Sequence, residues 1–226
     1  MLINKAKYLE IVQQLEEKKV VLVAVSKTKP VDAIKELYDL GQRDFGENYV
    51  QELAEKQQQL PEDIRWHFIG HLQSNKVKYI APFVHLIHGI DSFKLLKEIN
   101  KEAKKNNRTI DVLLQLHIAS EETKFGLDEN ELHELLDTNS GELHQLHNVN
   151  IRGLMGMASF TDDKEKIRRE FRQLKSLFDK YALPEMANSK FNILSIGMSS
   201  DYSIAIQEGG NMVRIGSLIF GERQNT

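Results

Sequence analysis

The chain has 226 residues, of which 41% are hydrophobic and 28% are charged, and this composition excludes an intrinsically disordered protein. Its 30 Lys and Arg residues against 33 Asp and Glu residues give a net charge of −3, so no overall basic field exists for nucleic acid or anionic lipid. The absence of cysteine excludes disulfides, thiol nucleophiles and thiolate metal sites. No long apolar run and no secretory leader pattern occur, so we expect no membrane partner and a cytoplasmic protein.

Strand and helix patterns alternate along the whole chain. An amphipathic helix pattern ends near Lys19, and the β-branched run at 20–26 then predicts a strand covered on both faces. Pro30 and Gly41 delimit the next helix. Further strands are predicted at 44–46, 65–70, 85–90, 110–118, 149–157, 193–198 and 212–216. Helix patterns cover 49–59, 74–80, 93–105, 129–136, 162–181 and 202–207, and a short helix follows Ser217.

Eight strands that alternate with helices predict parallel strands, either in an open doubly wound sheet or in a closed barrel. The number of units favours a single (β/α)8 TIM-type barrel with an extra N-terminal helix, in a compact version of a fold that usually has about 250 residues. No Gly/Ser/Pro-rich linker interrupts the sequence. We therefore predict one α/β domain over residues 1–226.

Lys27 follows the first predicted strand and shares the alternate-residue parity of Val21, Val23 and Val25, which directs it into the mouth of the barrel. An amine in an apolar mouth has a lowered pKa, so a neutral nucleophile becomes available to form a Schiff base with a carbonyl compound. The alternative is a lysine that simply leaves the sheet at its end. The neighbouring Lys29 has the opposite parity and is interpreted as solvent-facing.

Two polar turns follow the last two predicted strands, at Ser199-Ser200-Asp201 and at Gly216-Ser217. Loops at these two places frequently bind phosphate in such barrels. An ordinary helix N-cap is the alternative for one residue of the first turn. Together with Lys27, the two turns predict a phosphorylated carbonyl ligand.

Arg214 lies within the last predicted strand, where an unpaired guanidinium would be unfavourable. It either forms a structural salt bridge with a barrel carboxylate such as Glu47, or it faces the ligand. The histidines do not match a metal-ligand spacing with a carboxylate partner, so we expect no metal site.

The segments VAVSKTKP, FGENYVQE, WHFIGHLQSNK, KFGL, RGLMGM, SIGMSSD and MVRIGSLIFGER occur in this order. They closely resemble the pyridoxal phosphate homeostasis protein family (YggS/PROSC type) over nearly the whole chain. That family is similar to the isolated barrel domain of alanine-racemase-like, fold type III proteins. The resemblance implies pyridoxal 5′-phosphate (PLP) as the cofactor, bound to Lys27 as a Schiff base. It further implies that Asn48 lies beside the cofactor, that Arg214 faces the pyridine nitrogen, and that the phosphate is held by Ser199, Ser200, Gly216 and Ser217.

An arginine beside the ring nitrogen keeps this nitrogen unprotonated and weakens the ring as an electron sink. The resemblance accordingly implies a PLP-binding protein of vitamin B6 homeostasis without established turnover and without catalytic residues. It is compatible with a monomer and with transient transfer of PLP to apo-enzymes.

Two enzyme classes remain as alternatives. A PLP-dependent amino-acid racemase needs a base on each face of the substrate. We expect the β-domain that supplies one base in related racemases to be absent, which leaves Tyr49 or His67 as candidates. A lysine-dependent aldolase acting on a phosphorylated sugar would also use Lys27 and a phosphate site, but it would be colourless.

Overall fold

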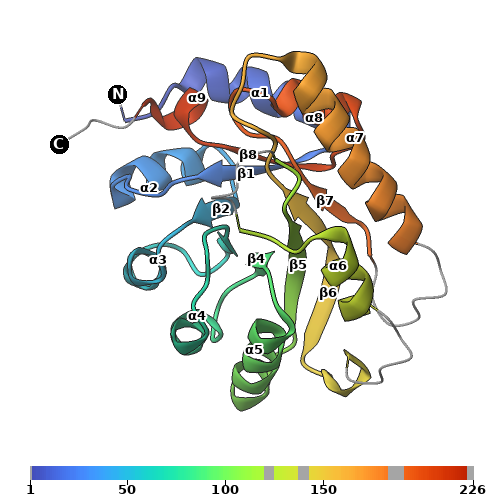
Figure 1. Cartoon of the computed structure of the whole chain (residues 1–226). Helices are drawn as coiled ribbons and strands as arrows, with labels where there is room; N and C mark the ends of the chain where they lie inside the picture. The colour runs from blue at the N-terminus through green and yellow to red at the C-terminus, as the bar shows by residue number, and fades with distance from the viewer. Residues whose placement is uncertain (1, 120–124, 137–142, 183–190, 223–226) are drawn as a thin grey trace.

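Eight parallel strands form a closed barrel in the order of the chain, and β8 pairs with β1 to complete it (Figure 1). The computed structural model describes residues 2–119, 125–136, 143–182 and 191–222. The strands are β1 Val21–Val25, β2 Asp44–Glu47, β3 Arg65–Phe68, β4 Leu86–Ile90, β5 Ile110–Leu116, β6 Val149–Gly156, β7 Ile193–Ser195 and β8 Met212–Ile215. The predicted α/β barrel is confirmed.

Helices surround the barrel, and α1 is the extra N-terminal helix (Figure 1). Their bounds are α1 Lys5–Glu17, α2 Val31–Asp39, α3 Val50–Gln57, α4 Val77–Ile80, α5 Phe93–Lys105, α6 Glu129–Leu136, α7 Lys164–Tyr181, α8 Tyr202–Gln207 and α9 Ser217–Phe220. Short 3₁₀ helices occur at Ser74–Lys76 and Leu143–Gln145, and the second of these was not predicted.

Local capping sets several of the observed helix ends. The side chains of Asn4, Ser92 and Asp163 accept hydrogen bonds from backbone N–H groups in the first turns of α1, α5 and α7. Such caps satisfy N–H groups that have no partner inside the helix. Because Asp163 caps α7, this helix begins slightly later than the pattern at 162–181 predicted.

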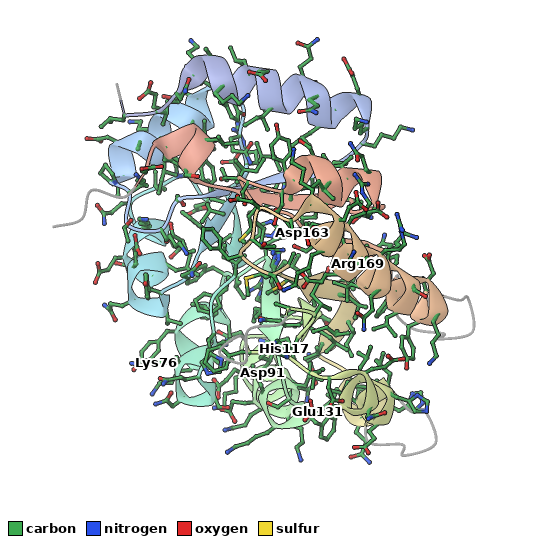
Figure 2. The ribbon with its side chains drawn as sticks, turned by 45° about the horizontal axis from the view of Figure 1, so that its top comes forward. Lys76, Asp91, His117, Glu131, Asp163 and Arg169 are labelled. Atoms are coloured by element: carbon green, nitrogen blue, oxygen red, sulfur yellow. The ribbon has the colours of Figure 1, made fainter. Side chains whose placement is uncertain are left out.

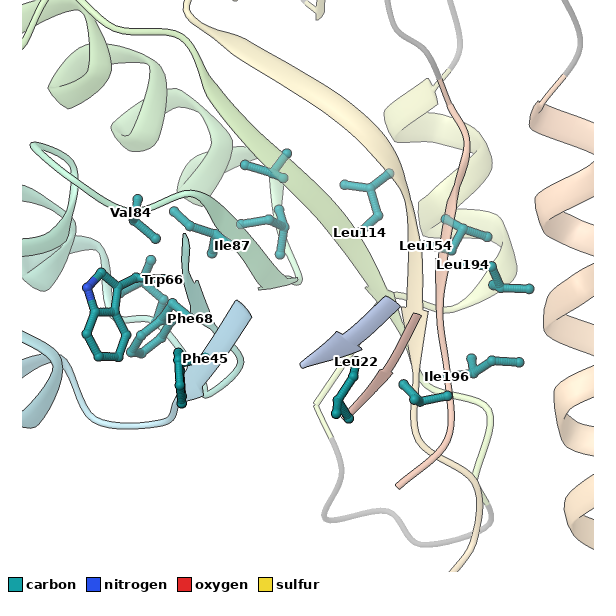
Figure 3. Packing of buried hydrophobic residues seen from close by; sticks show 14 of the residues in the cluster. Leu22, Phe45, Trp66, Phe68, Val84, Ile87, Leu114, Leu154, Leu194 and Ile196 are labelled. Atoms are coloured by element: carbon teal, nitrogen blue, oxygen red, sulfur yellow. The ribbon is translucent and has the colours of Figure 1, made fainter. Parts of the chain in front are cut away.

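The alternation of residues along each strand separates two apolar layers. Side chains that point outward pack beneath the helices, among them Leu22, Phe45 and Trp66 (Figure 3). Side chains that point inward form a smaller cluster inside the barrel, which consists of Val23, Leu86, Leu113, Met155 and Met212. The prediction that Lys27 points inward rests on the alternate-residue parity that it shares with Val23. Val23 belongs to the inner cluster, so this parity is that of the barrel interior.

The N- and C-terminal helices lie together at one side of the barrel (Figure 1). The backbone N–H of Asn4 donates to the carbonyl of Ile219, and the Nζ of Lys29 donates to the carbonyls of Phe220 and Gly221 at 3.0 and 3.2 Å. The solvent-facing interpretation of Lys29 was therefore wrong, because this half-buried cation binds the last carbonyls of α9. Within the described ranges, no helix is long and apolar enough to cross a bilayer.

Candidate functional site

Closure of the barrel places the first and last strands side by side. Val23 of β1 is paired with Arg214 of β8, while Val25 is paired with Gly46 of β2. Because β7 pairs with β8, the strands β7, β8, β1 and β2 are four consecutive strands of the barrel. Their carboxyl ends carry all the predicted cofactor-binding residues: Lys27, Asn48, Ser199, Ser200, Arg214, Gly216 and Ser217.

Lys27 lies in a turn immediately after β1 and is half-buried. The next residue, Thr28, has a φ of +64°, a left-handed conformation that is strained for a β-branched side chain. The N–H of Thr28 donates to Glu52 Oε1 at 2.6 Å, and the Oγ of Ser26 donates to Glu47 Oε1 at 2.6 Å. Both neighbours of Lys27 are thus held by carboxylates, which fixes the turn that presents the amine.

Lys56 joins these two carboxylates beneath the turn. Its Nζ lies 2.8 Å from Glu47 Oε1 and 2.6 Å from Glu52 Oε1, and it also donates to the carbonyl of Ser26 at 2.8 Å. Burial raises the pKa of Glu47 despite the opposing effects of Lys56 and Ser26. The sequence interpretation missed Lys56, although Glu52 and Lys56 have the i, i+4 spacing of a helical ion pair.

Arg214 does not pair with Glu47, so the salt-bridge alternative was wrong in naming that carboxylate. The Arg214 side chain is inside the barrel and only 4% of the residue is exposed. Nη1 donates to the carbonyl and Oγ of Ser195 at 2.8 and 2.6 Å, and Nη2 donates to the carbonyl of Gly156 at 3.0 Å. Burial lowers the pKa of Arg214 to about 10, so the guanidinium stays protonated at neutral pH.

Asn48 follows β2, beside the strand that leads to Lys27. Its Oδ1 is buried and, among the described residues, has no hydrogen-bond partner. A Cβ at Gly70 would lie 2.3 Å from the carbonyl oxygen of Asn48, so glycine allows the end of β3 to pack directly against this residue. A buried amide oxygen without a partner is unfavourable, and it fits a site that a ligand completes.

The two polar turns after β7 and β8 contact each other. The N–H of Gly216 donates to Ser199 Oγ at 3.3 Å, whereas Ser200 and Ser217 are exposed. Asp201, and not a serine, occupies the N-cap position of α8, and its Oδ1 accepts the N–H of Met198 at 2.5 Å. The N-cap alternative therefore does not account for either serine, and both hydroxyls fit a phosphate-binding role.

The opposite part of the mouth carries aromatic and ionic contacts that the sequence interpretation did not include. His71 stacks on Phe125 with a centroid distance of 4.4 Å, and its Nδ1 lies 3.3 Å from Asp91 Oδ2. Asp91 and His117 follow the ends of β4 and β5 and are labelled in Figure 2. His71, Asp91 and His117 thus follow β3, β4 and β5, which lie opposite the four strands that carry the predicted site in the barrel order.

One possible ligand set for a metal lies elsewhere in the described chain. Atoms of Asp44, His67 and His85 come within 4.8 Å of one another. However, Arg65 donates to both carboxylate oxygens of Asp44, at 2.7 and 2.5 Å. A guanidinium already neutralises this carboxylate, so we assign no metal to the cluster.

Comparison with known proteins agrees with this architecture. Residues 5–224 match the family model described as alanine racemase, N-terminal domain. The pyridoxal phosphate homeostasis protein of Aquifex aeolicus (strain VF5) is 43% identical over 204 residues, which cover 90% of this chain and 87% of that protein.

Solved structures of PipY from Synechococcus elongatus PCC7942 are also similar, at 34% identity. The form without PLP has a TM-score of 0.88 and covers 96% of this chain and 99% of PipY. The form with PLP bound has a TM-score of 0.82 and covers 94% and 99%. On this sequence identity and coverage, the chain belongs to the pyridoxal phosphate homeostasis protein family, whose barrel is that of the alanine racemase N-terminal domain.

Proposed function

We propose that this protein binds PLP as a Schiff base on Lys27 and acts in PLP homeostasis. The observation that carries the proposal is the position of Lys27 at the ends of the same four strands that present Arg214 and the contacting turns of Ser199 and Gly216. The names of the relatives and the PLP-bound form of PipY support the same ligand.

Each part of the site has a distinct task in this proposal. The Nζ of Lys27 forms a carbon–nitrogen double bond with the aldehyde carbon, and the aldehyde oxygen leaves as water. Ser199, Ser200, Gly216 and Ser217 supply hydroxyl and N–H donors for the phosphate. Bound PLP supplies an electron-accepting ring, and Arg214 limits this property because a protonated guanidinium does not give a proton to the ring nitrogen.

This arrangement favours a carrier over an enzyme, and the relatives are named homeostasis proteins. A weakened electron sink discourages removal of a proton from a bound amino acid. We therefore assign no catalytic residue, and we infer a PLP-buffering role that includes transient transfer to apo-enzymes. A monomer is sufficient for it, because every proposed cofactor-binding residue comes from one barrel.

The purified protein is expected to be yellow, because a PLP Schiff base absorbs visible light. Borohydride should bleach the colour by reducing the carbon–nitrogen bond, and peptide mapping should then find the cofactor mass on the peptide that contains Lys27. A colourless protein that retains no colour after incubation with PLP and dialysis would contradict PLP binding and would favour the aldolase alternative. Label on another lysine would overturn the anchor assignment alone.

The match to the alanine racemase N-terminal domain favours the racemase alternative. The structure reduces the number of residues that could act as its base. His67 is 1% exposed, and both ring nitrogens have partners, so it is not available as a base. Tyr49 is 53% exposed beside Asn48 and remains the candidate.

We expect no exchange of Cα hydrogen for deuterium when the PLP-loaded protein is incubated with L-amino acids in D2O. Mass spectrometry would detect the exchange, and an alanine racemase provides the positive control. Exchange at an enzymatic rate, lost in a Tyr49→Phe variant, would replace the carrier interpretation with the racemase.

A further inference from the structure

A row of hydrogen-bonded side chains runs through the barrel from its amino-terminal end to Arg214. Asp44 Oδ1 lies 3.0 Å from His67 Nε2, and His67 Nδ1 lies 2.9 Å from His88 Nε2. His88 Nδ1 then lies 3.1 Å from the Oγ of Ser195, which accepts a hydrogen bond from Arg214. We call Asp44, His67, His88 and Ser195 the interior chain.

The two ends of the interior chain determine where its protons lie. Arg214 can only donate hydrogen bonds, and an ionised Asp44 can only accept them. Burial alone would raise the pKa of Asp44, but the hydrogen bonds from Arg65 and His67 outweigh this effect and hold that pKa well below its usual range. Asp44 is therefore ionised at neutral pH.

One arrangement of protons then satisfies every member of the chain. His67 donates through Nε2 to Asp44, His88 donates through Nε2 to His67, and Ser195 donates through Oγ to His88. Burial lowers the pKa of His88 well below its usual value, which agrees with a neutral ring. All bonds from Arg214 to Asp44 point in one direction, and aligned hydrogen bonds strengthen one another.

This direction matters for Arg214 because no carboxylate is hydrogen-bonded to its guanidinium within the described part of the chain. Its partners are the Ser195 hydroxyl and the carbonyls of Ser195 and Gly156. A Ser195 oxygen whose proton is given to His88 is a better acceptor for Nη1. Removal of the acceptor at Asp44 permits the histidine tautomers to reverse, and Ser195 would then lose the partner of its own proton.

We propose that Asp44 is a positioning residue that orients Arg214 through the interior chain. The ion pair of Asp44 and Arg65, at the start of β2 and β3, thereby controls a guanidinium near the opposite end of the barrel. The consequence for PLP rests on the proposed function, whereas the arrangement of protons in the ligand-free protein does not.

Long-range ¹H–¹⁵N correlation NMR of the ligand-free protein tests the interior chain directly. In the wild type, His67 and His88 should carry a proton at Nε2 and none at Nδ1. Asp44→Asn keeps an acceptor oxygen and should keep these tautomers, whereas Asp44→Leu should populate the Nδ1–H form of both rings. A wild-type spectrum with an Nδ1–H tautomer at either ring would overturn the proposal, whether or not the protein binds PLP.

The effect on the site is measured by PLP titration and absorbance. Asp44→Leu should bind PLP about tenfold more weakly, the equivalent of one hydrogen bond, and should shift the visible band. Asp111→Asn is the matched control, because Asp111 pairs with Arg152 on β5 and β6 but is not bonded to the interior chain. Asp111→Asn should leave affinity and band unchanged.

Ser195→Ala tests the chain from its other end and does not depend on the folding of Asp44→Leu. It removes the hydroxyl that Arg214 binds, so the same change in affinity and band is expected. Unchanged affinity and absorbance in Ser195→Ala would contradict the proposal. So would reversed tautomers in Asp44→Leu without any effect on bound PLP.

Discussion

Replacement of Lys27 with alanine is expected to abolish the visible absorbance that the PLP-loaded protein retains after dialysis. Alanine has no amine to bond with the aldehyde, while the phosphate turns and Arg214 remain in place. PLP should therefore still bind, but reversibly, and it should be removed completely by dialysis that leaves the wild-type colour intact. Absorbance before and after dialysis measures the loss.

Lys29→Ala is the matched control, because Lys29 is two residues away and also half-buried. Its Nζ binds the carbonyls at the end of α9, so this variant should keep the colour and lose only some stability. Cofactor mass attached covalently to Lys27→Ala after borohydride reduction would place the Schiff base on another amine. Loss of colour in both variants would indicate that the colour depends on the conformation of the turn and not on the Lys27 amine.

The sequence predicts the barrel and most of the proposed site because both depend on local patterns. Alternation of strand and helix predicts parallel strands, and polar turns after those strands must lie at one end of a barrel. Parity along β1 predicts that Lys27 points toward the interior, and Val23 of the same strand does belong to the inner cluster. Closure of β8 onto β1 then places Arg214 beside the strand of Lys27.

Side-chain pairing could not be predicted in the same way. Glu47 is equally compatible in sequence with Arg214 or with Lys56, and only the packing of α3 against β2 decides for Lys56. Lys29 was misinterpreted because its partners are carbonyls about 190 positions later in the chain. His88 and Ser195 have the parity of the barrel interior, but their hydrogen bonds require the register between distant strands.

Lys56→Met is expected to destabilise the folded protein by about 3–5 kcal/mol, measured as the free energy of unfolding in urea. Lys56 is buried, and its removal leaves Glu47 with a buried charge and without its cation. Lys101→Met is the control, because its ion pair with Glu98 is on the surface and 58% of the Lys101 side chain is exposed. The control should change stability by no more than about 0.5 kcal/mol.

The pH dependence of the stability of Lys56→Met distinguishes an unpaired buried charge on Glu47 from lost packing of the Lys56 side chain. Burial already raises the pKa of Glu47, and the loss of Lys56, which opposes this effect, should raise the pKa further. A folded-state pKa above the unfolded value means that the folded state binds the extra proton, so stability falls as pH rises through the folded-state pKa. The variant should therefore be closest to wild type near about pH 5 and weakest near about pH 8. Addition of Glu47→Gln should remove this slope and recover part of the lost stability, whereas an equal deficit at both pH values would show that Lys56 acts through its packing alone.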